Sequence, residues 1–264
     1  MEWWLGYAAI GAAVGFFAGM LGIGGGAIMV PLLVMIFEAQ GLPRAQVLHL
    51  AVGTAMATIL FTSVASVRAH AARGAIRWDI ARNVTPGILL GGLVGSWIAS
   101  FIPPLVFAAI FTAVIYVAAT NLLIDRKPKP SRQAPGFAGM TVFGFVVSAA
   151  SAFAAIGGAF LTVPFMLWCN VPMLPAIGTA AVIGFPIALS GTIGFVVTGL
   201  REASLPPYSV GFVYLPALGG IVVSSMLMAP VGAAAAHRLP TRWLRRIFAV
   251  LFYVMATRML LTFL

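Results

Sequence analysis

Long runs of apolar residues, separated by short polar stretches, dominate the chain. Ten such runs occur, and charged residues and prolines mark the boundaries between them. A membrane crossing needs roughly 20 apolar residues, so most of these runs are long enough to form a transmembrane helix. The predicted segments span 3–21, 24–37, 47–67, 83–101, 105–124, 137–155, 157–168, 175–198, 210–235 and 247–264. This pattern predicts an all-α polytopic membrane protein.

The composition excludes a soluble protein of this length. Of the 264 residues, 62% are hydrophobic and 8% are charged, and the mean hydropathy is +1.09. Soluble proteins average about 25% charged residues. The net charge of +10 is concentrated in short loops, so we expect a lipid bilayer and no nucleic acid as the partner of the basic residues. The first residues lack a basic region and a cleavage site, which predicts a retained first helix.

A basic stretch rich in proline at 125–136 divides the chain into two similar halves. The run Gly24-Gly-Gly-Ala-Ile-Met-Val-Pro31 matches Gly157-Gly-Ala-Phe-Leu-Thr-Val-Pro164 at an offset of 133 residues (164 − 31). Two further matches follow in the same order, pairing 51–55 with 176–180 and 116–120 with 253–257. We therefore predict two transmembrane repeats of five segments each, 1–124 and 137–264, joined by a cytoplasmic linker at 125–136.

The basic residues predict that the two halves have opposite orientations. Lysine and arginine accumulate in cytoplasmic loops. One basic loop follows the third segment of the first half, but the corresponding loop of the second half follows its fourth segment. This shift by one helix is the signature of an inverted repeat and places both termini outside the cytoplasm. The three basic clusters are Arg68, Arg73, Arg77 and Arg82; Arg126, Lys127, Lys129 and Arg132; and Arg238, Arg242, Arg245 and Arg246.

Inversion requires an odd number of crossings in each half, so the first two segments of each half must form a down-and-up pair. The second members, 24–37 and 157–168, would rise only about 21 Å and 18 Å as helices. The hydrocarbon layer is roughly 30 Å thick. We therefore expect short or re-entrant, glycine-rich helix pairs that line a cavity, because irregular backbone in a membrane is tolerated there.

Glycines at the break in each half are the first candidate substrate-binding residues. Glycine allows a sharp turn, and a helix that begins after the turn directs free N–H groups and its positive dipole end at a ligand, which suits an anion. The alternative is close helix packing through small residues, to which we assign Gly87, Gly91 and Gly95. The candidates are Gly24, Gly25 and Gly26 in the first half and Gly157 and Gly158 in the second.

Thr54, Thr179 and His49 are further candidates. The two threonines occur in matching Gly-Thr pairs, and each hydroxyl could donate to a substrate oxygen or bond its own helix backbone. His49 is an ionisable residue within or at the edge of an apolar segment, which marks it as a functional candidate. Its repeat counterpart is Leu174, so a structural role at a helix interface stays open.

Several kinds of chemistry lack the residues that they need. The five acidic residues lie in loops or at the end of the chain, and Cys169 is the sole cysteine, so we expect no metal site. No phosphate-binding loop is present. The sequence thus predicts neither a cofactor nor an enzyme.

The motifs resemble those of the sulfite exporter TauE/SafE family of TSUP-type membrane transporters. The resemblance spans nearly the whole chain, although Ala155 and Ala159 stand where the first copy has Gly22 and Gly26. It implies transport of sulfite, sulfonates or related organic anions across the bacterial inner membrane. The motifs that carry it are Gly19-Met-Leu-Gly-Ile-Gly-Gly-Gly-Ala-Ile-Met-Val-Pro31, His49-x-Ala-Val-Gly-Thr54 and Arg73-Gly-x-Ile-Arg-Trp-Asp79.

We therefore expect a secondary transporter that exports sulfite or an organosulfonate by alternating access. The glycine turns and the neighbouring threonines would bind the anion near the midplane. Two alternatives stay open at this point. One is a permease of the same fold for an unrelated carboxylate or neutral metabolite, and the other is a non-transporting subunit of a membrane assembly.

Overall fold

A computed structural model describes residues 2–21, 25–72, 74–124, 133–236 and 241–264. Ten helices and one two-stranded hairpin make up the described chain. The helices are α1 (Glu2–Leu21), α2 (Gly26–Ala39), α3 (Arg44–Ala71), α4 (Trp78–Ser100), α5 (Pro104–Ile124), α6 (Phe137–Ala154), α7 (Ala159–Trp168), α8 (Met173–Gly199), α9 (Leu215–Ala236) and α10 (Thr241–Phe263). Strands β1 (Ser209–Val210) and β2 (Val213–Tyr214) pair antiparallel before α9. The predicted all-α polytopic fold is confirmed.

Six of these helices are long and apolar enough to cross a membrane, namely α3, α5, α6, α8, α9 and α10. Helices α2 and α7 contain only 14 and 10 residues, as the short second segments predicted. Each carries a proline, Pro31 or Pro164, inside the helix. A proline cannot donate to the carbonyl four residues earlier, so one helical hydrogen bond is missing in each short helix.

The helix boundaries differ from the predicted ones mainly near charged residues. Helix α4 begins at Trp78 and α10 at Thr241, several residues before the predicted starts, because arginine has a high helix propensity even where a charge ends an apolar run. The predicted ninth segment, 210–235, was wrong at its beginning. Residues 209–214 form the hairpin instead, with Gly211 at a positive φ of 56°, and the helix starts at Leu215.

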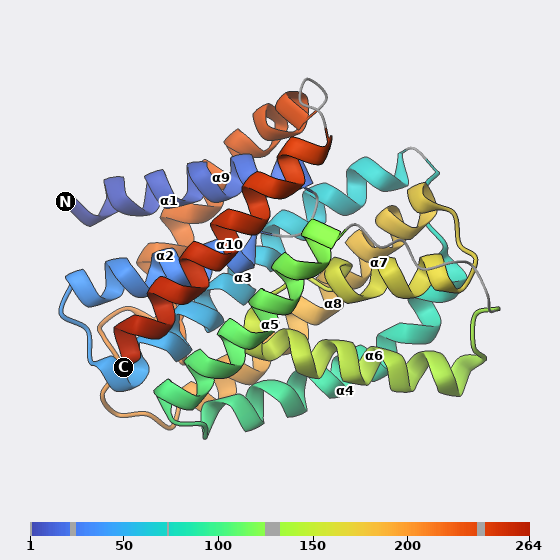
Figure 1. Ribbon diagram of the computed structural model, residues 1–264. Coiled ribbons are helices and arrows are strands. Elements are labelled where there is room, and N and C mark those ends of the chain that lie inside the picture. The colour runs from blue at the N-terminus through green and yellow to red at the C-terminus, as the bar shows by residue number, and fades with distance from the viewer. Residues whose placement is uncertain (1, 22–24, 73, 125–132, 237–240) are drawn as a thin grey trace.

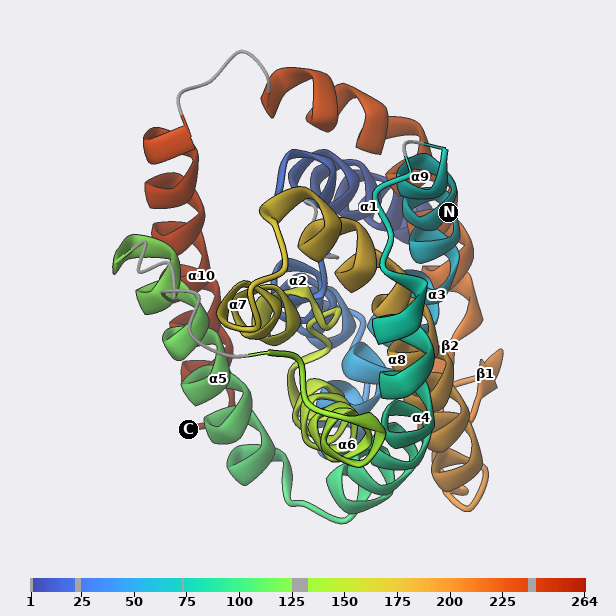
Figure 2. The same ribbon diagram turned by 90° about the vertical axis from the view of Figure 1, so that its right-hand side faces the viewer.

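Two helix hairpins converge on the middle of the molecule. In Figure 1 the pair α1–α2 enters from the left and the pair α6–α7 enters from the right. Figure 2 shows α2 and α7 in the interior, between the pair α5 and α10 on one side and α3, α8 and α4 on the other. Helix α2 is apolar around its whole circumference, and most of its residues are buried, as expected for a helix surrounded by protein.

The two halves interlock. Helix α1 packs along α9, and α4 packs along α6, so the first helix of each half contacts the fourth helix of the other. Helix α3 also contacts α8, and α5 contacts α10. The contacts are symmetric between the halves: α1 with α9 corresponds to α6 with α4, and the pairs α3 with α8 and α5 with α10 each join equivalent helices. The ranges 1–124 and 137–264 are therefore not separate globular units in the structure.

Small residues permit the closest of these contacts. A β-carbon added to Gly91 would lie 2.2 Å from the carbonyl oxygen of Phe145, and Gly87 and Gly95 face the same helix, α6. On the opposite side, Gly15 in α1 is equally close to the backbone of Ser225 in α9. The assignment of the α4 glycines to helix packing is confirmed.

Candidate functional site

The two breaks in the helices meet inside the molecule. Gly25 precedes α2 with a left-handed backbone (φ 63°, ψ −14°), and Gly26, the first residue of α2, is buried. A β-carbon added to Gly26 would lie 1.9 Å from the carbonyl oxygen of Ala155, which follows α6 in the other half. Glycine is needed here because a side chain would push the two segments apart. Gly24 lies outside the described residues.

Gly157 and Gly158 form the turn that leads into α7. The carbonyl oxygen of Gly158 accepts hydrogen bonds from the backbone N–H groups of Leu161 and Thr162, at 3.2 and 2.9 Å. It also accepts one from the Thr162 hydroxyl at 2.7 Å. A β-carbon on Gly158 would lie 2.5 Å from Cδ1 of Ile187 in α8. Gly25 and Gly158 therefore cap the two short helices, and the first turn contacts the second half at Ala155.

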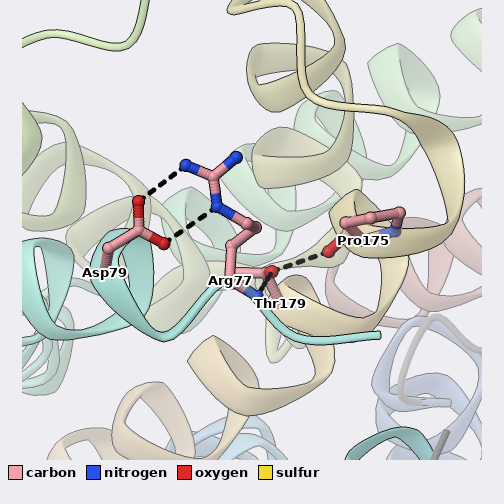
Figure 3. Close-up of polar contacts among 4 residues, drawn as sticks. All are labelled: Arg77, Asp79, Pro175 and Thr179. Carbon is pink, nitrogen blue, oxygen red and sulfur yellow. Dashed lines mark hydrogen bonds and ion pairs between the residues drawn. The ribbon is translucent and has the colours of Figure 1, made fainter. Parts of the chain in front are cut away.

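Thr54 and Thr179 each accept a hydrogen bond from the backbone of the opposite half. The Tyr214 N–H donates to Thr54 Oγ1 at 3.0 Å. The Arg77 N–H donates to Thr179 Oγ1 at 2.9 Å, and the Thr179 hydroxyl donates to the Pro175 carbonyl at 2.6 Å (Figure 3). Tyr214 directly precedes α9 and Arg77 directly precedes α4, so the two bonds are related by exchange of the halves.

Gly53 and Gly178, which precede these threonines, also lie very close to the backbone of the opposite half. A β-carbon on Gly53 would lie 2.3 Å from the Phe212 carbonyl oxygen, and one on Gly178 would lie 1.8 Å from the Ala75 carbonyl oxygen. Each Gly-Thr pair therefore holds the segment that leads into the fourth helix of the other half. The buried threonines have a structural role, and their binding of substrate stays a prediction.

Sequence reasoning missed the partner segments of these pairs, 75–77 and 212–214. The first of them lies within the motif Arg73–Asp79, but the second carries no comparable signal in the sequence. Arg77 and Asp79 form an exposed ion pair with contacts of 2.9 and 2.7 Å (Figure 3). The Arg77 guanidinium holds the pKa of the Asp79 carboxyl below its usual range. The resulting carboxylate lies in the first turn of α4, where it opposes the positive end of the helix dipole.

His49 is buried in α3 and contacts Phe212 in the hairpin segment 209–214. Its Nε2 lies 3.1 Å from the carbonyl oxygen of Ala99, and its ring packs against Phe107 and Phe212 with centroid distances of 5.1 and 5.2 Å. The structure therefore gives His49 a contact between helices, and a role in transport stays a prediction.

Two voids of unequal size lie beside the two short helices. A cavity of about 310 Å³ lies among α5, α6 and α7 and reaches the turn at Gly158. A void of only about 10 Å³ lies among α1, α2 and α10 and reaches the turn at Gly25. The larger one reaches the lower limit of small-molecule sites, roughly 300 Å³. Ser151 is the polar side chain in its lining, and sequence reasoning did not single it out.

The site offers hydroxyl and backbone groups in place of charged ligands. Among the residues that the structure describes, no three His, Cys, Asp or Glu side chains gather where they could hold a metal ion. Helix starts and hydroxyls are hydrogen-bond donors that the interior offers to a ligand.

The protein is a bundle of apolar helices in which two short helices begin inside the protein. The first helix of each half packs against the fourth helix of the other half. This architecture is typical of a polytopic membrane transporter. The sequence profile of the sulfite exporter TauE/SafE family matches residues 7–259. The chain belongs to this family, as the motifs predicted.

Two relatives have been named as transporters. The chain is 33% identical over 253 residues to a "Probable membrane transporter protein" of Haemophilus influenzae, and the match covers 96% of each chain. It is 25% identical over 234 residues to the "Probable membrane transporter protein YdhB" of Bacillus subtilis, covering 86% of this chain and 88% of the relative. No solved structure matches the chain significantly. The family and these names indicate a multi-pass membrane transporter.

Proposed function

We propose that the protein is a secondary transporter of small sulfur-containing anions, sulfite or organosulfonates, that exports them across the bacterial inner membrane. The family description supports sulfite as the parent substrate. The observation that carries the proposal is the meeting of the two helix breaks, where Gly26 at the start of α2 touches the backbone at Ala155, close before α7.

An anion buried among apolar helices needs several donors to replace its water, since an unpaired buried charge is very costly. The starts of α2 and α7 provide backbone N–H groups and the positive ends of two helix dipoles in one interior region. No lysine lies in a described helix, and Arg68, Arg82 and Arg258, in α3, α4 and α10, are exposed, so these side-chain cations do not provide the charge in the interior. Binding near the meeting point of the two halves would suit alternating access, in which one half moves against the other.

The test is transport by the purified protein in proteoliposomes loaded with sulfite. We expect uptake of labelled sulfite by exchange, and competition by an aminosulfonate but not by a carboxylate of the same length. Equal competition by the carboxylate would favour the permease for unrelated metabolites. No flux of any of these solutes by folded protein would favour the non-transporting assembly subunit.

Gly158→Ala tests the turn itself. The added β-carbon meets the end of the flexible Ile187 side chain, which can shift, so the protein should fold. We expect sulfite exchange to fall at least fivefold because the β-carbon and the shifted Ile187 side chain crowd the turn before α7. Gly184→Ala is the matched control, since nothing lies within 4 Å of its added β-carbon. Unchanged exchange by Gly158→Ala would count against the turn as part of the site.

A further inference from the structure

The cavity beside the turn at Gly158 is half-open, with a mouth on the outside of the helix bundle and a floor inside it. At the mouth, Val117 of α5 is 58% exposed and Leu161 of α7 is 39% exposed. The floor residues, Ala154 and Ile156, are 0% and 6% exposed. The volume of about 310 Å³ therefore connects the outer surface of the bundle with its interior.

The mouth lies at the middle of a helix that is long enough to cross the membrane. Helix α5 has 21 residues, and Ala113, Val114 and Val117 line the cavity from its middle third. At 1.5 Å per residue, Ala113 lies about 14 Å from the first residue of α5 and about 17 Å from the last. The hydrocarbon core of a bilayer is roughly 30 Å thick, so the medium at this opening is the acyl chains of the lipids.

The lining of the cavity suits an apolar ligand and disfavours an ion. Nine of the ten residues that line it are glycine or have apolar side chains, and Ser151 is the exception. A serine hydroxyl in a helix can bond the carbonyl of its own preceding turn, so it does not require a polar ligand. A charged group would lose its water here without compensation, which is very costly. A flexible hydrocarbon chain would lose nothing on entering.

The equivalent helices of the other pair meet directly. Helix α2 packs against α10, and the void beside them holds only about 10 Å³. Exchange of the halves turns this pair into α7 and α5, which the cavity separates in the described chain. Helices in a membrane associate through close van der Waals contact. An apolar chain between α5 and α7 would supply contacts that α2 obtains from α10.

We propose that an acyl chain of a bilayer lipid occupies this cavity, entering between Val117 and Leu161 and ending against the floor residues beside the turn at Gly158. The hydrocarbon at the mouth, the apolar lining and the separation of α5 from α7 all favour this occupant. The chain acts as a structural ligand that fills the space between the two helices. This lipid site goes beyond the proposed function and does not depend on which solute the protein carries.

Photolabelling of the full-length protein in lipid nanodiscs tests the site. The probe is a phosphatidylcholine with a diazirine near the terminal methyl of one acyl chain, the part of the lipid that lies at the membrane midplane. Mass spectrometry should find adducts at the floor residues and also at Val146, which is exposed on α6. Ala27, which is buried and lines the small void, should carry none.

Ala113→Leu should lower the adducts at the floor residues at least fivefold relative to those at Val146, because the larger side chain occupies the cavity. Ala113 is exposed, so this variant should fold. Ala109→Leu is the matched control, since Ala109 is also exposed on α5, one turn earlier, but does not line the cavity. It should leave the labelling unchanged. Ala150→Leu fills the cavity from α6 and is the second test variant.

Three results would overturn the proposal. Adducts at Val146 without adducts at the floor residues would show that the cavity is closed to lipid. Floor adducts that survive both Ala113→Leu and Ala150→Leu would show that the probe arrives by another route. Loss of the floor adducts in a dimer, trapped as a disulfide through Val117→Cys in a Cys169→Ala background, would assign the mouth to a second copy of the chain. Each result leaves solute transport, and with it the proposed function, to its own test.

Discussion

Single hydroxyl groups form hydrogen bonds between the two halves of this transporter. Thr54 and Thr179 are fully buried, and each oxygen accepts a backbone N–H that belongs to the other half. The donors, Tyr214 and Arg77, are the residues that precede α9 and α4, where a helix has no internal partner for its first N–H groups. A side chain that satisfies such a group across the interface fixes where the helix begins.

Thr179→Val should destabilise the protein, because the isosteric side chain leaves the Arg77 N–H without its acceptor. The cost of an unsatisfied donor is about 1–3 kcal/mol. In a chain of this size we expect the apparent Tm in detergent to fall by several degrees. Thr54→Val should have a similar effect through Tyr214.

The matched control is Thr198→Val in the same helix. The Thr198 hydroxyl donates to the Gly194 carbonyl at 2.8 Å and forms no hydrogen bond with a described residue of the other half. Its loss should lower the Tm by clearly less. Equal shifts for Thr179→Val and Thr198→Val would refute the role of Thr179 as an anchor between the halves.

Pairs of helices pack through glycine, and this sets how closely the two halves interlock. Helix α4 places Gly87, Gly91 and Gly95 against the backbone of α6. Lipid tails are as apolar as leucine, so helices in a membrane associate by close contact and not by exclusion of water. The absence of a side chain at these positions is therefore part of what holds α4 to α6.

Gly91→Ala should separate α4 from α6. Its β-carbon would lie 2.2 Å from the Phe145 carbonyl oxygen, a backbone atom that cannot rotate away. Overpacking of this kind typically costs 1–3 kcal/mol. Thermal unfolding should show a lower Tm and membranes should yield less folded protein, whereas Gly184→Ala, with open space around its β-carbon, should be neutral or slightly stabilising. A Gly91→Ala protein as stable as wild type would show that this contact can relax.

At the scale of the whole molecule, two described connections, the loop that ends at Arg77 and the hairpin at 209–214, lie at opposite ends of the long helix α3. The start of α3 lies near the hairpin at 209–214, and the start of α8 lies near the loop that ends at Arg77. Helix α3 has 28 residues, about 42 Å of helix, which separates these ends by more than the hydrocarbon thickness. Both chain ends lie on the left of Figure 1, at the end opposite to the last turn of α3. The side of the membrane that each end faces stays a prediction from the arginine-rich loops.

Cysteine labelling tests the orientation. In a Cys169→Ala background, a membrane-impermeant maleimide added from outside should label Ala203→Cys and should not label Ala72→Cys. Both positions are exposed at their respective ends of the molecule. Labelling of both from the same side would end the argument for two oppositely oriented halves, and labelling of position 72 alone would reverse the assigned sides.

The sequence by itself determined the helical membrane fold, most helix positions and the family. Apolar runs of membrane length and breaks at Gly25 and Gly158 depend on local composition and on backbone freedom, which a sequence displays directly. The order of matching motifs likewise predicted two related halves. The hairpin at 209–214 was missed because four paired residues leave almost no periodic signal.

Only the tertiary structure decided what the candidate residues contact. Thr54 and Thr179 accept hydrogen bonds from backbone groups more than 100 residues away, and no local pattern in the sequence encodes such a pairing. A cavity of about 310 Å³ lies beside Gly158, whereas only about 10 Å³ lies beside Gly25. The volume left between helices follows from how three segments pack together, so it could not be read from any one of them.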